Sequence, residues 1–284
     1  MLHIARGAKK MSKPKVHHYV PQFYLRRFVD AAGRLWVWDR DRDRTFAATP
    51  NSIASESNFY LLPELAEFGH DPLTLEKQFF CGLESVSAIT GQWLELIRAG
   101  EALDRIPILK SNREVASLFI VLQFLRTADT RSFLARFAAA DIAQPTASSS
   151  YSRSLHADVL WDDALVNSFR QQVESSTWVF AKNETGSPYV TSDNPVSFRT
   201  SNNRQWTKKA RMLNSDSYVV YPPLAPDAIL YCYPRKRKMA RQEHRAIRLS
   251  NISCHNDSWN DNQRELCSGI HGVQICRIKQ QRLY

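Results

Sequence analysis

The sequence lacks a long hydrophobic run. No stretch of about eighteen or more apolar residues occurs, which is the length that a membrane-spanning helix needs. The first ten residues, MLHIARGAKK, also lack the apolar central region of a secretory signal. These absences predict a soluble protein with no membrane partner.

Cysteine is scarce, and the five cysteines form no C-x-x-C pair. An odd number of cysteines without a signal sequence is typical of a reducing compartment, so we expect a cytoplasmic protein. Cys254, His255, Cys267, His271 and Cys276 lie within a short span, but their spacing matches no common structural zinc pattern. We therefore expect half-buried thiols there instead of a zinc site.

Three motifs of common enzymes are also missing: G-x-G-x-x-G, G-x-x-x-x-G-K-[ST] and G-x-S-x-G. Their absence removes the sequence evidence for dinucleotide binding, for P-loop phosphate binding and for a serine-hydrolase elbow. Only nine of the 284 residues are glycine, whereas 43% are hydrophobic and 11% aromatic. This composition predicts an ordered chain with a core large enough for one domain.

Positive charge is in excess, with 38 Lys and Arg residues against 28 Asp and Glu residues and a formal net charge of +10. Such an excess favours contact with polyanions such as nucleic acid. Basic residues concentrate at 9–15, at 208–211 and, most densely, in PRKRKMARQEHR at 234–245. Each run is either a solvated surface or a phosphate-binding segment, so nucleic acid is a candidate partner.

Helical spacing dominates the middle of the chain. Apolar residues recur over 71–97 with the period of a helix, between a capping Asp71 and Gly100. A second helix is predicted to begin at SNRE (111–114), which has the pattern of a capping box. A third is predicted at 158–175, after the loop-like QPTASSSYSRS.

Strand patterns flank these helices. LWVWDRDRDRTFAA predicts a β-hairpin, and short β-branched runs follow residue 177. These runs are STWVFA, PYVTS, VSFRT, SYVVYPP, AILYCYP, AIRLS and VQICRIK. We therefore expect an α+β fold in which a central bundle of three or more long helices packs on a mainly antiparallel sheet, formed by the C-terminal third and the N-terminal hairpin.

The expected organisation is a flexible extension at 1–14, which precedes a second good start at Met11, and a single domain at 15–284. Within this domain the helical part covers about 70–176 and the strand-rich part about 177–280.

The segment KVHHYVPQFYLRRF places two histidines before a proline. Neighbouring side chains of an extended strand point to opposite faces, so at most one of His17 and His18 faces a site. Pro21 favours extended backbone before it and a short helix after it, which carries Tyr24 and Arg26. The segment is either a folded amino-terminal anchor with hydrogen-bonded histidines or the source of a functional His18.

The segment VTSDNPVSF places Asp193 and Asn194 in a turn where one strand ends and another begins. Asp and Asn in such turns commonly bond their own backbone, and Asn before Pro opens turns. A carboxylate and an amide at a rigid strand end are also well placed to act as catalytic or metal-binding oxygen ligands.

Polar residues border the apolar stripes of the expected helices. Glu84 lies beside the first stripe, and Gln123 and Arg126 lie together at i and i+3 beside the second. Polar residues at the edge of an apolar stripe usually have a structural role, with their polar atoms hydrogen-bonded. An arginine near carboxylates also suits a phosphate site, because the guanidinium offers a fork of charge-assisted donors.

Several elements in this order resemble the prokaryotic DUF4238 family: KVHHYVPQFYLRRF, ESVSAI, LFIVLQFLRTADTR, YVTSDNPV and YPPLAPDAILY. The resemblance runs from about residue 15 to residue 279 and implies no established activity. Its motif residues fall on His18, Pro21, Tyr24, Leu25, Phe28, Gln123, Arg126, Ser192, Asp193, Asn194 and Pro195. The cysteine and histidine cluster after Cys254 is not part of the pattern.

Two functional hypotheses follow. In the first, the protein is a metal-dependent hydrolase of nucleic acid, in which Asp193 and Glu84 hold Mg²⁺ or Mn²⁺, His18 is base or ligand, and Asn194 assists. The substrate would contact Gln123, Arg126, Tyr24 and Arg26. No P-D…E-x-K pair and no H-N-H arrangement accompany these residues. In the second, the protein is a non-catalytic module that binds nucleic acid or a protein, and the same residues are structural.

Overall fold

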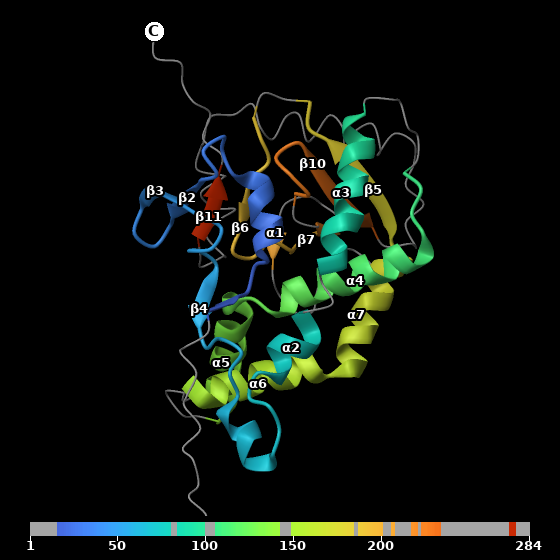
Figure 1. Ribbon diagram of the computed structural model, residues 1–284. Coiled ribbons are helices and arrows are strands. Elements are labelled where there is room, and N and C mark those ends of the chain that lie inside the picture. Colours follow the sequence, from blue (N-terminus) through green and yellow to red (C-terminus); the bar gives the residue numbers. More distant parts are fainter. Residues whose placement is uncertain are drawn as a thin grey trace, which may run out of the picture.

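The computed structural model of the chain has a mixed α+β fold (Figure 1). It describes residues 16–80, 84–99, 106–142, 149–184, 187–200, 206–207, 217–220, 223–233 and 273–276. The backbone alone is described at 78–80, 84, 137–142, 149–150, 198–200, 206–207, 217–220 and 273–276. Within these ranges no helix combines the length and the apolar character that crossing a membrane requires.

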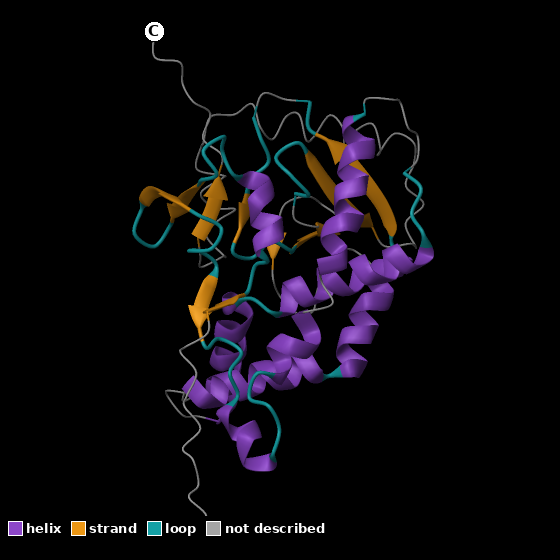
Figure 2. Cartoon of the chain, in the orientation of Figure 1, coloured by secondary structure: helices purple, strands orange, loops and turns teal. Residues whose placement is uncertain are grey.

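Most of the longer helices lie in the lower part of the view, whereas one stands upright among the strands (Figure 2). The helices are α1 (Gln22–Leu25), η1 (Arg26–Phe28), η2 (Pro63–Phe68), α2 (Thr74–Phe80), α3 (Glu84–Arg98), α4 (Lys110–Leu125), α5 (Ala128–Ile142), α6 (Ser149–Trp161) and α7 (Asp163–Ser175). Among the longer ones, α4 packs on α7 and α5 packs on α6. The α+β class is confirmed, whereas the expected central bundle is not.

The first and third predicted helices have boundaries that differ from the sequence prediction. The helix expected between the cap Asp71 and Gly100 is described as α2 and α3, and residues 81–83 between them lie outside the described residues. The helix expected at 158–175 is α6 followed by α7, and the start of α6 lies in the expected loop. The Asp162 carboxylate accepts a hydrogen bond from the backbone N–H of Leu165 at 2.9 Å. Asp162 therefore caps α7, which apolar spacing alone does not reveal.

The start of α4 corrects the expected capping box. The helix begins at Lys110, and its N-cap Leu109, two residues before the predicted cap Ser111, offers no side-chain oxygen. The pair Ser111 and Glu114 therefore lies inside the first turn and does not form the predicted box. Packing of the apolar face, rather than a cap, fixes this helix.

The strands form three antiparallel sheets. β1 (Val16–His18) pairs with β4 (Ser55–Ser57). A four-stranded sheet has the order β3 (Arg44–Ala48), β2 (Leu35–Asp39), β11 (Val273–Cys276) and β6 (Thr191–Ser192). A five-stranded sheet has the order β5 (Thr177–Lys182), β10 (Ala228–Tyr233), β9 (Ser217–Val220), β7 (Ser197–Thr200) and β8 (Trp206–Thr207). The predicted N-terminal hairpin is confirmed, and it joins a sheet with β11; the strand predicted at 246–250 lies outside the described residues.

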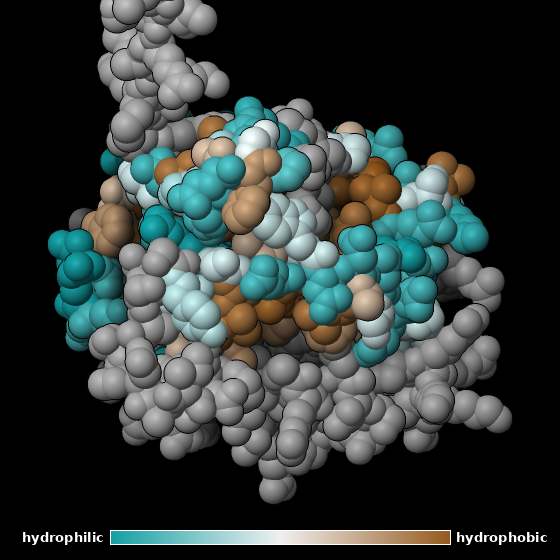
Figure 3. Space-filling model, turned by 90° about the horizontal axis from the view of Figure 1, so that it is seen from below, coloured by the Kyte–Doolittle hydropathy of each residue, from teal (hydrophilic) through white to brown (hydrophobic). Residues whose placement is uncertain are grey.

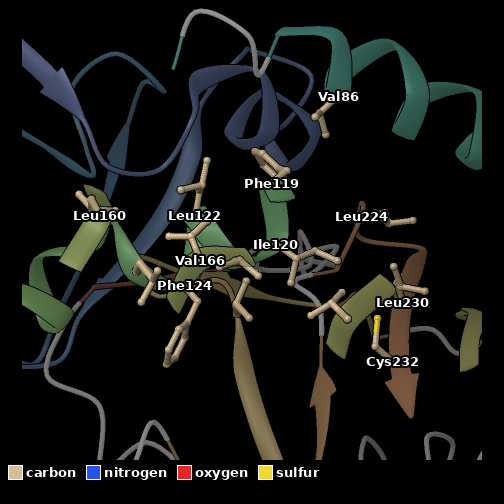
Figure 4. Packing of buried hydrophobic residues seen from close by; sticks show 14 of the residues in the cluster. Val86, Phe119, Ile120, Leu122, Phe124, Leu160, Val166, Leu224, Leu230 and Cys232 are labelled. Carbon is tan, nitrogen blue, oxygen red and sulfur yellow. The ribbon is translucent and has the colours of Figure 1, made fainter. Parts of the chain in front are cut away.

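The main core surrounds α4 (Figure 4). Phe119 and Leu122 of α4 are almost completely buried in one cluster with Leu160 of α6, Val166 of α7 and Leu230 of β10. Burial of each such side chain contributes about 1.5–3 kcal/mol. A smaller cluster on the amino-terminal side holds α1, η1 and β2 together through Val20, Tyr24, Leu25, Phe28, Leu35 and Val37.

Candidate functional site

The two histidines of β1 point to opposite faces, as the alternation of a strand predicts. His17 is fully buried: its Nδ1 accepts a hydrogen bond from the backbone N–H of Tyr60 at 2.9 Å, and the two rings stack with centroids 5.8 Å apart. His18 is half-buried and lies beside Gln22 and Asn51. His18 is therefore the histidine of this pair that remains in reach of solvent.

The surroundings of His18 favour its neutral form. Burial lowers the pKa of the imidazole, and the positive charge of Arg126 lowers it further, although a hydrogen bond to the Asn51 carbonyl acts in the opposite direction. The His18 Nε2–H donates to that carbonyl at 3.2 Å. Nδ1 is then the accepting nitrogen, and the Gln22 side-chain amide donates a hydrogen bond to it at 3.4 Å.

Gln123 and Arg126, at the carboxyl end of α4, hold the chain that leaves β1. The Gln123 amide donates to the carbonyl oxygen of Tyr19 at 2.8 Å, and the Arg126 guanidinium donates to the carbonyl oxygen of His18. Arg126 Nε also donates to the Tyr60 hydroxyl at 3.3 Å. Gln123 is 1% exposed and Arg126 is 3% exposed, so these contacts are internal.

The carbonyl oxygens that end α4 are also satisfied by side chains. The Leu125 carbonyl accepts a hydrogen bond from His156 Nε2 at 2.8 Å, and the Arg126 carbonyl accepts one from the Tyr60 hydroxyl at 2.8 Å. A buried helix end without such donors would be costly, because its last carbonyls have no partner within the helix. The polar residues around this end therefore stabilise a helix terminus inside the protein.

The S-D-N-P turn after β6 is closed by its own side chains. The Ser192 hydroxyl accepts a hydrogen bond from the Asn194 N–H at 3.1 Å and donates to the Asn194 carbonyl at 2.9 Å. The Asn194 amide donates to the Asp193 carboxylate at 3.2 Å. Asp193 and Asn194 are both buried, and the bonds between the Ser192 hydroxyl and the backbone of Asn194 make this an ST-type turn.

The amino-terminal segment reaches this turn from the opposite end of the sequence. The Tyr24 hydroxyl is hydrogen-bonded to the hydroxyl of Thr191 on β6. Burial raises the pKa of Tyr19, and the nearby negative charge of Asp193 raises it further. Tyr19 and Tyr24 therefore lie close to the S-D-N-P turn.

Most of the predicted site residues come together. Side-chain contacts and charge effects place His18, Tyr24, Gln123, Arg126, Asp193 and Asn194 around the chain from β1 to α1. Arg26 is exposed and donates to the Gln22 side chain at 2.9 Å. Glu84 begins α3, but its side chain lies outside the described residues, so its role as a metal ligand stays a prediction.

The structure adds two aromatic residues that the sequence did not single out. Tyr60 binds His17, Arg126 and the end of α4, and Tyr19 links Gln123 to the turn at Asp193. The aromatic pair in NFYLLP was the available signal for Tyr60. Within the part of the chain that the structure describes, no group of three or more His, Cys, Asp and Glu side chains is arranged to hold a metal ion.

Comparison with known proteins identifies a family but no activity. Residues 16–267 match the family model described as "Protein of unknown function (DUF4238)". No curated protein and no solved structure matches the chain.

Proposed function

The chain belongs to the DUF4238 family, whose description names no activity, and we propose from its geometry that it is a non-catalytic module that binds nucleic acid. In this proposal the polar motif residues hold the fold together. Binding then depends on positive charge elsewhere on the chain.

The observation that carries this proposal is the use of Gln123 and Arg126. Both side chains are buried and donate to the main-chain carbonyls of Tyr19 and His18. A group that contacts a substrate must present its donors to that substrate, whereas these donors face the protein's own backbone. The local bonds of Ser192 and Asn194 fit the same structural role.

The charge that would attract a polyanion is unevenly distributed. In the described part of the chain, Asp and Glu residues outnumber Lys and Arg residues. Several exposed cations there are also paired, as Arg34 is with Asp30 and Arg98 with Asp227. Figure 3 shows hydrophilic and hydrophobic residues side by side on one face of this part. We therefore assign the nucleic-acid contact to basic segments such as 234–245, which lie outside the described residues.

The test uses purified wild-type protein and an Asp193→Ala variant, each incubated with mixed DNA and RNA in Mg²⁺, in Mn²⁺ and in EDTA. The proposal predicts that nucleic acid remains intact and that both folded proteins retain it, with retention that weakens as salt rises. Circular dichroism establishes that the variant is folded. Failure of the wild-type protein to retain nucleic acid at low salt would contradict the proposal.

The second candidate is a divalent-metal-dependent hydrolase of nucleic acid, and the state of His18 favours it. A half-buried neutral imidazole suits a general base once the Gln22–His18 contact gives way to a substrate, because Nδ1 is the nitrogen that accepts a proton. Asp193 lies near the neighbouring Tyr19 and would supply a carboxylate ligand for Mg²⁺ or Mn²⁺ together with Glu84. Metal-dependent cleavage by the wild-type protein, lost in a folded Asp193→Ala variant, would establish this function instead.

A further inference from the structure

We propose that Arg131 of α5 and Arg153 of α6 form a binding site for an oxyanion such as a phosphate group. The two helices pack side by side, and β4 lies at the same end of the molecule (Figure 1). This site is separate from the motif residues, and free phosphate suffices to occupy it, so it does not depend on nucleic-acid binding.

Arg131 is held in a fixed position. Its Nε donates to His156 Nδ1 at 3.3 Å, and its Nη2 donates to the carbonyl oxygen of Phe59 at 2.5 Å. The guanidinium also lies 3.4 Å from the centroid of the Phe59 ring. These contacts use two of its three nitrogens, so the fork is oriented in advance and retains donors for a ligand.

Arg153 lies on the neighbouring helix, close enough to Arg131 for the two charges to interact. It precedes His156 by three residues on α6, and residues with this spacing share one face of a helix. Its Nε is buried and makes no hydrogen bond. A buried donor without an acceptor is unfavourable, and an oxyanion would satisfy it.

The two positive charges act on each other. Burial lowers the pKa of Arg131 to about 10, and the charge of Arg153 contributes to this lowering. Neither arginine forms a salt bridge with a carboxylate of the described residues. An anion between them would replace repulsion by two attractions, and both arginine residues are partly exposed.

Glu56 is the carboxylate that competes for this place. It lies on β4, is exposed, and its negative charge favours the charged form of Arg131 from beyond salt-bridge distance. Removal of this negative charge leaves the positive charges of the two arginines less well balanced. A variant without it should therefore bind an anion more tightly than the wild-type protein.

The experiment measures the melting temperature of the full chain in increasing potassium phosphate, against potassium chloride at matched ionic strength. The wild-type protein should be stabilised specifically by phosphate, because a ligand that binds only the folded state raises the melting temperature. In Arg153→Gln the apparent phosphate affinity should fall by about tenfold or more, the loss expected for one charge-assisted hydrogen bond. Glu56→Gln should bind phosphate more tightly, and the exposed control Arg34→Gln should match the wild-type protein.

Two results would overturn the site. One is the absence of phosphate-specific stabilisation of the wild-type protein. The other is an equal response of wild type and Arg153→Gln, which would indicate an adventitious ion only. If Arg153→Gln does not fold, an unchanged affinity in Glu56→Gln overturns the site in its place.

Competition by a 5′-phosphorylated oligonucleotide distinguishes the two sources of the phosphate. Displacement of bound phosphate assigns the site to nucleic acid, whereas binding without displacement assigns it to a free phosphate compound. If phosphate binds but no oligonucleotide is retained, the proposed function fails while the oxyanion site stands. If oligonucleotide is retained without phosphate-specific stabilisation, only the oxyanion site fails.

Discussion

Four arginine side chains of the described part donate to main-chain carbonyl oxygens. These contacts join Arg27 to Ser87 and Leu224, Arg113 to Glu174 and Ser176, Arg126 to His18, and Arg131 to Phe59. Such an arginine joins distant segments through a fork of donors and leaves fewer of its N–H donors for an outside partner. A count of basic residues in the sequence therefore overstates the number of donors available to a polyanion.

Arg126 gives the clearest test at this scale. The variant Arg126→Met retains much of the side-chain volume but leaves the His18 carbonyl and the Tyr60 hydroxyl without their donor. We expect the free energy of unfolding to fall by about 3 kcal/mol. The control Arg34→Met removes an arginine whose side chain is 51% exposed and should change stability by less than about 0.5 kcal/mol. Urea denaturation measures both; equal losses in the two variants would contradict the structural role.

His18 predicts a pH dependence of stability. Its pKa is lower in the folded protein than in the unfolded chain, so the unfolded state binds the proton more readily. Its contribution to stability is therefore complete above about pH 6.5 and decreases as the pH falls through the folded pKa. Urea midpoints at about pH 7.5 and pH 5.5 should differ more for the wild-type protein than for His18→Gln. If the His18→Gln variant shows the same pH dependence as the wild-type protein, the pKa of His18 is not shifted by folding.

Among the elements, α4 combines the main core with the candidate site. Its apolar spacing predicts both its existence and its buried residues, because packing follows the period of a helix. The sequence did not predict its start, since Leu109 caps it without a side-chain bond. The break between α6 and α7 was also missed, because apolar spacing continues across Asp162.

The candidate site was only partly visible in the sequence. Short segments with unusual polar residues identified His18, Gln123, Arg126 and Asp193. Their partners were not identifiable, because a contact such as that between Arg126 and Tyr60 joins residues 66 positions apart. No local pattern encodes which carbonyl a distant arginine will bind.

The core around α4 allows a matched pair of variants within one element. Phe119→Ala removes a ring that is 1% exposed and should lower the free energy of unfolding by about 3 to 5 kcal/mol, through lost burial and the cavity that remains. Leu109→Ala alters a residue that is 69% exposed and should cost less than about 0.5 kcal/mol. Urea unfolding of both variants measures the difference. A cost for Leu109→Ala close to that of Phe119→Ala would show that the start of α4 is packed in a way that this structure does not have.

At the scale of the whole molecule, the charge is unevenly distributed along the chain. The described residues contain more acidic than basic side chains, although the complete chain carries a net charge of +10. The positive excess thus belongs to segments outside the described part. The proposed attraction to nucleic acid is therefore a property of these segments, and the motif residues maintain the domain that carries them.

Replacement of Lys236, Arg237 and Lys238 by glutamine tests this assignment. The slope of log affinity for single-stranded DNA against log salt should become shallower by about 0.7 for each of these residues that contacts a phosphate. The melting temperature of the protein should not change. The control variant is Lys110→Gln, in which the replaced side chain is 86% exposed. This variant should leave the slope unaltered. An unchanged slope in the triple variant would place the contact elsewhere.

The central claim is that the polar motif residues are structural, and Gln123 tests it most directly. The measurement is fluorescence anisotropy of a labelled oligonucleotide with wild-type protein and a Gln123→Met variant, at a temperature where circular dichroism shows both to be folded, alongside their urea unfolding curves. We predict equal dissociation constants and a lower free energy of unfolding for the variant, because the Tyr19 carbonyl loses its donor. A dissociation constant raised about tenfold with unchanged stability would contradict the account and place Gln123 in contact with the nucleic acid.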